Sequence, residues 1–231
     1  MIRHEMLPNF VLLLENTSGA ILPGQVKTPV WESEVDEFTE LDECWSEAIF
    51  DANLPITAIL DNLNIPYACS GSKDINDPKT IQMIHQRSEP VFIYSGFGGA
   101  LLRKDVLSLG KRFLHVHGGY LPDFKGSTTN YFSLLIENTL GASAIFLSEE
   151  IDSGPVLLRR KFPPPRDRQA IDHIYDSGAR AKILIETLQK HLKSGKWEFE
   201  LAENAGGETY YIIHPVLKHI AILEESIHNK V

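Results

Sequence analysis

The sequence predicts an α/β protein with a mostly parallel sheet and flanking helices. Short apolar runs, typical of buried strands, alternate with segments of helical spacing from residue 9 to about residue 160. After the break at Pro163-Pro164-Pro165, an amphipathic pattern continues through residues 171–192. At 231 residues the chain has room for one large domain. We expect a main domain over residues 1–165 and a C-terminal helix and extension, residues 166–231, packed on it.

The composition indicates which classes of partner and which cellular compartment to expect. The 22 basic and 31 acidic residues give a formal net charge of −9. A chain this acidic is a poor general binder of phosphate backbones, so we expect no nucleic-acid partner. No apolar run approaches the roughly 20 residues that span a bilayer, and the first residues lack a signal-peptide pattern, so we expect a cytoplasmic protein without a membrane contact. Cys44 and Cys69 fit neither a disulfide framework nor a zinc finger, and we expect both as buried thiols.

The first half of the chain shows the strand–helix alternation most clearly. We expect a helix that begins at Pro78, with Asp77 as its N-cap. Residues 32–47 carry eight acidic residues and no basic one, which is typical of a solvated face and also compatible with a cation or basic-partner site. The other elements expected here are strands at 9–14, 64–69, 90–94 and 113–117, and helices at 56–63 and 101–109.

The second half adds a buried helix, a strand and a long amphipathic helix. Residues 128–138 carry an apolar stripe, and residues 141–147 form a second apolar run. The long helix over residues 171–192 is expected to stop near Gly195. The tail, residues 208–223, is expected either to pack back on the chain or to pair with another subunit, which would make a homodimer.

Two histidines and one aspartate lie where strands are expected to end. Because alternate side chains of a strand share a face, His115 and His117 should point the same way, beside Gly118 and Gly119. Asp152 leaves the second apolar run, and active centres of open α/β sheets sit at the carboxyl ends of strands. Each residue alone also fits a structural role, such as a turn aspartate or a strand histidine that donates to a carbonyl. The nearby glycines do not form G-x-G-x-x-G, which argues against a nicotinamide or flavin site.

Two stretches carry a resemblance to a known family. They are His115-Val116-His117-Gly118-Gly119-Tyr120-Leu121-Pro122-Asp123-Phe124-Lys125-Gly126-Ser127 and Asp152-Ser153-Gly154-Pro155. This order resembles the 10-formyltetrahydrofolate-dependent formyltransferases, which include methionyl-tRNA, glycinamide ribonucleotide and sugar N-formyltransferases. The family pattern is a strand ending in Asn-x-His, a Leu-Pro and basic-Gly turn, and a later Asp-x-Gly-Pro. Residues 94–102 look like the family's pterin-contacting loop.

The resemblance implies a Rossmann-like formyltransferase fold and assigns residues to roles. His117 matches the family's catalytic histidine and Asp152 its catalytic aspartate, whereas His115 stands where the family has asparagine. His115, also assigned to the catalytic set, either does the asparagine's job with a changed pH dependence or signals altered chemistry. The co-substrate implied is 10-formyltetrahydrofolate, and its expected contacts are Phe97, Gly98, Gly99, Ala100, Leu101, Leu147, Glu150 and Ile151.

The implied reaction is formyl transfer to the amine of a small acceptor. We expect a small amine, with a nucleotide-linked amino sugar as first candidate, because the chain is acidic and is not expected to hold the extra carboxy-terminal domain of tRNA formyltransferases. Lys125, Ser127 and Thr128 are candidate acceptor contacts, or else a plain polar turn and helix cap. The alternatives are a hydrolase of the same donor, a metal site made of His115, His117 and Asp152, and a catalytically silent relative; we expect no metal.

Overall fold

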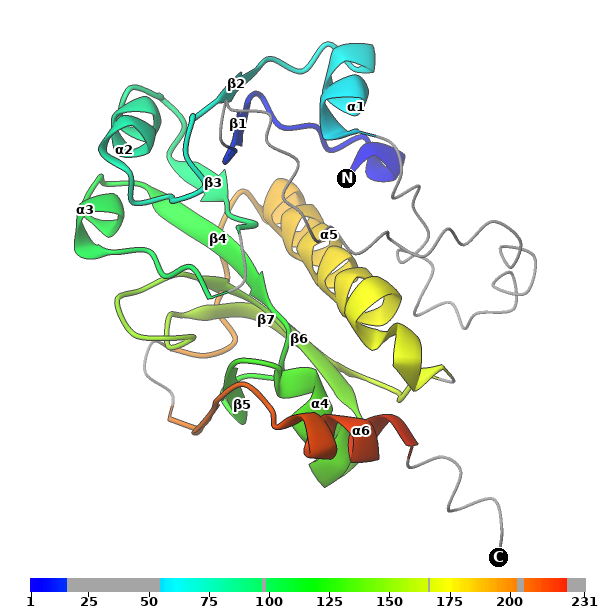
Figure 1. Ribbon diagram of the computed structural model, residues 1–231. Helices are drawn as coiled ribbons and strands as arrows, with labels where there is room; N and C mark the ends of the chain where they lie inside the picture. Colours follow the sequence, from blue (N-terminus) through cyan, green and yellow to red (C-terminus); the bar gives the residue numbers. More distant parts are fainter. Residues whose placement is uncertain (16–54, 97–98, 166, 203–205, 224–231) are drawn as a thin grey trace, which may run out of the picture. The chain divides into compact units, whose positions relative to one another are not determined.

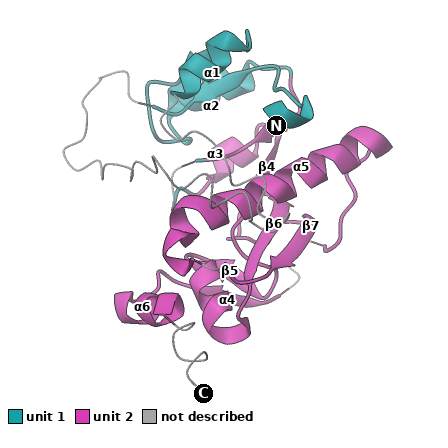
Figure 2. Cartoon of the chain, turned by 90° about the vertical axis from the view of Figure 1, so that its right-hand side faces the viewer, with its two compact units in different colours: residues 1–43, 50–88, 96–100 teal, residues 44–49, 89–95, 101–231 magenta. Residues whose placement is uncertain are grey.

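The computed structural model describes five stretches of the chain (Figure 1), namely residues 1–15, 55–96, 99–165, 167–202 and 206–223. The acidic run and Cys44 lie outside these residues. The chain divides into two compact units (Figure 2): unit 1 holds residues 1–43, 50–88 and 96–100, and unit 2 holds residues 44–49, 89–95 and 101–231. The boundary expected at residue 165 falls inside unit 2, and that division stays a prediction. None of the helices in the described stretches is long and apolar enough to cross a bilayer.

Unit 1 contains a two-stranded parallel sheet with two helices. Its elements are η1 (Ile2–His4), β1 (Val11–Leu13), α1 (Ile56–Asn62), β2 (Tyr67–Cys69) and α2 (Pro78–His85). The expected helix start is confirmed, because the Asp77 carboxylate accepts a hydrogen bond from the Lys79 backbone N–H at 2.9 Å. Leu13, Leu60 and Ile65 form the core of this unit.

One expectation for unit 1 is wrong. Cys69 is exposed rather than buried, and it ends strand β2. Its thiol donates a hydrogen bond to the Glu15 carboxylate at 2.9 Å, which raises the pKa of the thiol. Cysteine is a residue type that is usually buried, but Cys69 lies at the end of β2 and is exposed there.

Unit 2 is built on a four-stranded mixed sheet. The strands follow the order β3 (Val91–Ile93), β4 (Arg112–His117), β6 (Leu140–Phe146) and β7 (Val156–Phe162). β3 and β4 are parallel, whereas β6 runs antiparallel to both β4 and β7. Three of the five strand pairings in the described stretches are parallel. The predicted α/β class is confirmed, and parallel pairings predominate over the described stretches as a whole, whereas two of the three pairings of this sheet, β4–β6 and β6–β7, are antiparallel.

Helix α5 covers this sheet. It runs along β6 and β7 and also contacts β4 (Figure 1). The single helix expected over residues 171–192 is divided into a π-helical turn, η5 (Ile171–Tyr175), and α5 (Asp176–Ser194). The predicted stop is confirmed, because Gly195 ends α5 with a left-handed φ of 69°. The remaining helices are α3 (Lys104–Leu107), α4 (Thr129–Glu137), η4 (Arg168–Ala170) and α6 (Pro215–Leu223).

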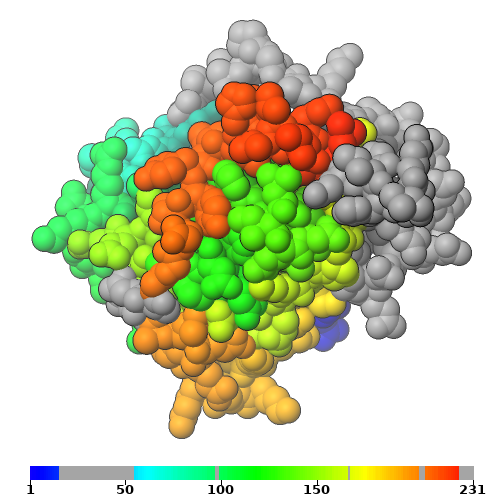
Figure 3. Space-filling model, turned by 90° about the horizontal axis from the view of Figure 1, so that it is seen from below, coloured from blue at the N-terminus to red at the C-terminus, as the bar shows by residue number. Residues whose placement is uncertain are grey.

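The tail packs back on its own chain. Strand β8 (Glu208–Tyr210) pairs in parallel with β5 (Phe124–Gly126), and α6 packs against α4. Figure 3 shows this C-terminal segment, in orange and red, lying over the green middle of the chain. Arg168 adds a hydrogen bond to the Ala221 carbonyl at 2.9 Å. A homodimer contact stays a prediction.

Substitution of Gly126 tests whether the β5–β8 pairing stabilises the fold. A Cβ built on Gly126 would lie 2.1 Å from the Tyr210 carbonyl oxygen, at a φ of 98°. We expect Gly126→Ala to lose about 1–2 kcal/mol for the left-handed backbone and a further 1–3 kcal/mol for overpacking. Gly195→Ala is the matched control, because Gly195 has a φ of 69° and nothing within 4 Å of its Cβ position. Equal losses for the two variants in urea denaturation would contradict a tight pairing here.

Candidate functional site

Strand β4 presents the two histidines as the alternation predicted. His117 is buried and His115 half-buried, while Leu114 and Val116 are buried as the alternate residues of the strand. The Nε2 atom of His117 lies 2.8 Å from the carbonyl oxygen of Phe124, to which it donates a hydrogen bond. The two imidazoles therefore start from one strand and one face but meet different partners.

Asp152 reaches His117 by a route that differs from the expected one. Because β6 is antiparallel to β4, the carboxyl end of β6 lies beside the amino-terminal half of β4 and not beside its carboxyl end. The loop of residues 147–155 instead brings Asp152 back, so that its Oδ2 lies 3.4 Å from Nδ1 of His117. A Cβ on Gly154 would lie 1.8 Å from the Phe146 carbonyl oxygen. This crowding explains why the loop needs a glycine two residues after the aspartate.

The short strand β5 holds both members of this pair. Phe124 accepts the hydrogen bond from His117, and the backbone N–H of Gly126 donates to Asp152 Oδ2 at 2.8 Å. Between them, the buried Lys125 extends its Nζ to Ser153 Oγ at 3.1 Å. Phe124, Lys125 and Gly126 thus form hydrogen bonds with His117, Ser153 and Asp152, respectively. This strand leaves no periodic signal in the sequence, because three residues are too few for one.

His115 is oriented by the backbone that follows β3. Its Nδ1 lies 3.0 Å from the carbonyl oxygen of Tyr94. A carbonyl can only accept, so Nδ1 carries the hydrogen. Burial lowers the pKa of His115, partly offset by the Tyr94 hydrogen bond, and the positive charge of Arg180 lowers it further.

A cluster of polar side chains, which no sequence pattern predicted, stabilises the end of β4. Arg180 donates from Nη1 to the Val116 carbonyl at 3.1 Å and pairs through Nε with Asp176 at 2.8 Å. Asn130 donates to the other Asp176 oxygen at 2.7 Å. A Cβ on Gly118 would lie 2.4 Å from Asp176 and 2.6 Å from Arg180, so the glycine after His117 admits this cluster. The one available signal was Asn130, a polar residue within an apolar helix.

The three expected acceptor contacts have different surroundings. Lys125 is buried against Ser153, and Ser127 is exposed. The Thr128 hydroxyl accepts a hydrogen bond from the Ile213 backbone N–H at 2.9 Å, so it ties the tail rather than capping α4. Their contact with an acceptor stays a prediction.

The expected folate contacts divide between the two units. Phe97 and Gly98 lie outside the described residues, and Gly99 and Ala100 belong to unit 1. The rest belong to unit 2, where Leu101 is 58% exposed, Ile151 is 45% exposed, Leu147 is half-buried and Glu150 is exposed. Exposed apolar side chains such as Leu101 and Ile151 are compatible with a ligand contact, and the assignment stays a prediction.

The histidines and the aspartate do not converge as metal ligands. His115 turns Nδ1 to a carbonyl, and His117 has its nitrogens at Phe124 and Asp152. Within the stretches that the structure describes, no group of three or more His, Cys, Asp or Glu side chains is placed to hold a metal ion.

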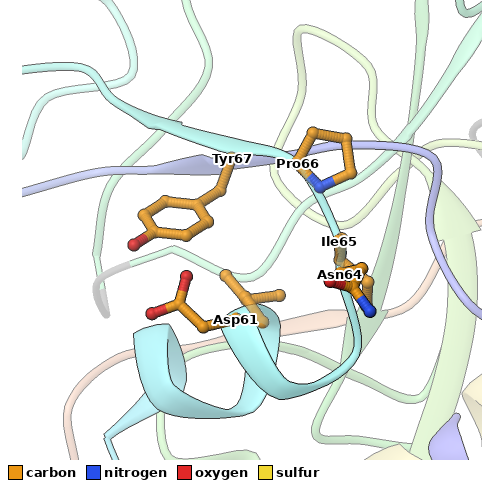
Figure 4. A pocket seen from close by; sticks show the side chains of 6 residues that line it. Asp61, Asn64, Ile65, Pro66 and Tyr67 are labelled. Atoms are coloured by element: carbon orange, nitrogen blue, oxygen red, sulfur yellow. The ribbon is translucent and has the colours of Figure 1, made fainter.

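A separate open pocket lies within unit 1. It has a volume of about 400 Å³ and is lined by the end of α1, the start of β2 and the turn that joins them, including Asp61, Asn64 and Tyr67 (Figure 4). The Asp61 carboxylate raises the pKa of the Tyr67 hydroxyl. None of the residues predicted for the site lines this pocket.

The fold and the motif of this chain resemble those of formyltransferases. No protein-family model matches the chain. The sequence resemblance is confirmed by methionyl-tRNA formyltransferase from Ruminiclostridium cellulolyticum, which is 28% identical over 125 residues, 52% of this chain and 39% of that protein. The chain thus spans about two fifths of the length of this curated relative.

Solved structures show the same fold. The formyltransferase PseJ from Anoxybacillus kamchatkensis, in complex with UDP-4,6-dideoxy-4-formamido-L-AltNAc and tetrahydrofolate, matches with a TM-score of 0.51 at 16% identity over 68% of this chain and 80% of that one. A variant of HypX from Aquifex aeolicus matches with a TM-score of 0.53 at 17% identity, over 75% of this chain and 29% of that one. The predicted formyltransferase fold is confirmed.

The environment of His115 predicts a pH-dependent stability. Its pKa in the folded chain is below the ordinary 6.5, so the unfolded chain binds a proton that the folded chain does not. Stability should therefore rise with pH from the lowered pKa up to about 6.5 and level off above it, as far as His115 contributes. Urea denaturation between about pH 5 and 7.5 should show a smaller pH dependence in His115→Asn than in the wild type. Identical pH dependence in both would contradict the lowered pKa.

Proposed function

We propose that this chain transfers a formyl group from 10-formyltetrahydrofolate to the amine of a small acceptor. The observation that carries the proposal is the approach of His117 and Asp152 to 3.4 Å within the motif shared with formyltransferases. The two residues come from separate parts of the sequence and are held by one strand, β5. A buried histidine–carboxylate pair held this firmly is a common element of active sites.

The chemistry of formyl transfer sets three requirements. The acceptor amine attacks the formyl carbon, a tetrahedral oxyanion forms, and its collapse gives a formamide and tetrahydrofolate. This needs a polar environment aimed at the oxyanion, a group that manages the amine proton, and fixed partners that keep both in place. The titratable groups available for these requirements lie together at one end of β4 and belong to His115, His117 and Asp152.

The loop of residues 147–155 supports a folate contact next to the reaction centre. Asp152 occupies the left-handed region with a φ of 47° and directly follows the exposed Ile151. A folate whose pterin ring packs on Ile151 and Leu147, with polar contacts to Glu150, would carry the formyl group on its N10 close to the pair. The folate contacts and the Asp152 carboxylate would then belong to one loop.

The proposed acceptor is a small amine, with a nucleotide-linked amino sugar as first candidate. The net charge of −9 supports this choice, because a large polyanion gains little from an acidic surface. PseJ was crystallised with a UDP-linked formamido sugar, whereas the curated relatives are named for methionyl-tRNA.

The first test is the pair itself. We expect His117→Asn and Asp152→Asn each to lower formyl transfer by about 10²–10⁴-fold, because each removes one member of the pair. The assay follows formamide and tetrahydrofolate formation, with formate measured alongside to detect hydrolysis. His173→Asn, at an exposed residue of η5, is the control variant that should keep wild-type activity. Full activity in both site variants would overturn the assignment.

The second test is the acceptor. We expect formylation of one or more nucleotide-linked amino sugars and none of methionyl-tRNA at equal concentration and moderate salt, since electrostatic repulsion from the acidic chain opposes tRNA binding. Mass spectrometry of the products decides between them. Efficient formylation of methionyl-tRNA would show that the proposed acceptor class is wrong.

A further inference from the structure

The two histidines of β4 differ in the one property that proton transfer requires, a free ring nitrogen. In the described stretches both nitrogens of His117 are engaged by the protein. Its Nε2 donates to the Phe124 carbonyl at 2.8 Å, and its Nδ1 lies 3.4 Å from Asp152 Oδ2. The ring is 5% exposed, and a Cβ on Gly119 would lie 2.7 Å from its Nε2. His117 would have to leave these contacts to exchange a proton with a substrate.

His115 has the opposite arrangement. Its Nδ1 donates to the Tyr94 carbonyl at 3.0 Å, which fixes the tautomer of the neutral ring with the hydrogen on Nδ1. Its Nε2 then carries a lone pair, and this atom has no hydrogen-bond partner among the residues that the structure describes. The ring is half-buried on the face that His117 shares. A neutral imidazole in this tautomer accepts a proton at Nε2 and cannot donate one from there.

The charged and titratable neighbours of His115 come from three elements. Arg180 on α5 and His117 on β4 both favour the neutral ring, and burial of the ring acts in the same direction more strongly. Asp152 on the loop and the Tyr94 carbonyl favour the protonated ring. The balance lowers the pKa of His115, so that the neutral ring predominates near pH 7.

We propose that Nε2 of His115, rather than His117, accepts the proton of the attacking amine, while His117 and Asp152 form the fixed frame of the site. This inference rests on the proposed formyl transfer. The amine nitrogen forms a bond to the formyl carbon, and its proton passes to Nε2. As the bond between the formyl carbon and N10 of the folate breaks, the same proton is returned to N10, which leaves a formamide, tetrahydrofolate and a neutral His115.

This assignment gives the histidine a different task from the asparagine found at this place in the family. Asparagine is a fixed amide donor and has no proton to exchange near neutral pH. A neutral His115 held by Tyr94 offers an acceptor in that position. The departure from the family pattern therefore changes the role of the residue.

The test compares His115→Asn with His115→Ala across a pH series of kcat. If His115 is the base, His115→Asn loses about 10²–10⁴-fold in kcat, and the acid limb of the wild-type profile, which lies below pH 6.5, disappears. Added imidazole should restore part of the activity of His115→Ala, where the ring site is open, and none of that of His115→Asn. His173→Asn should keep both the rate and the acid limb.

Four results separate the possible failures. Wild-type kcat retained in His115→Asn would overturn the inference and favour a donor role that asparagine can fill. An unchanged acid limb in His115→Asn would overturn it as well. Nitrogen-15 NMR of the wild type near pH 7 should show the hydrogen of His115 on Nδ1, and a hydrogen on Nε2 would overturn the inference without any activity measurement. A wild type that formylates no amine would instead reject the proposed function.

Discussion

The site depends on one short strand that satisfies two groups costly to bury. A histidine and a carboxylate taken out of water lose more than they gain unless their polar atoms find fixed partners. Strand β5 supplies those partners from its backbone, with the Phe124 carbonyl for His117 and the Gly126 N–H for Asp152. Backbone groups cannot rotate away as side chains do, so the 3.4 Å approach of the pair is set by the path of the chain. The buried Lys125, between the two on β5, donates a hydrogen bond to Ser153, the residue that follows Asp152 on the loop.

Strand β5 is in turn held by the end of the chain. Three residues cannot form a stable strand alone, and β8 is the partner that pairs with β5. The close approach needs Gly126, because any side chain there would meet the Tyr210 carbonyl. Thr128 extends the same contact by accepting from the Ile213 N–H. The C-terminal segment is therefore part of the frame of the site, although by sequence it reads as an extension.

The features that could be predicted from the sequence are those whose pattern lies within a few neighbouring residues. The shared face of His115 and His117 follows from strand alternation alone, and the start of α2 and the end of α5 follow from Asp77 and Gly195. The motif placed Asp152 beside His117, but for the wrong geometric reason, since local sequence does not report whether β6 runs parallel or antiparallel to β4. The β5–β8 pairing and the Asn130–Asp176–Arg180 cluster escaped because each joins short or single-residue signals that lie far apart in the chain.

The difference between the two histidines shows why position on a face does not settle a role. Both side chains leave β4 in the same direction, yet one meets a carbonyl and a carboxylate, and the other meets a single carbonyl. A ring with both nitrogens engaged holds the shape of the site, because moving it would break the contacts with Phe124 and Asp152. A ring with one nitrogen engaged is oriented and still has an atom to react with. The Tyr94 carbonyl thus orients His115 as a carboxylate does in many histidine sites, and its hydrogen bond offsets only part of the lowering of the pKa by burial.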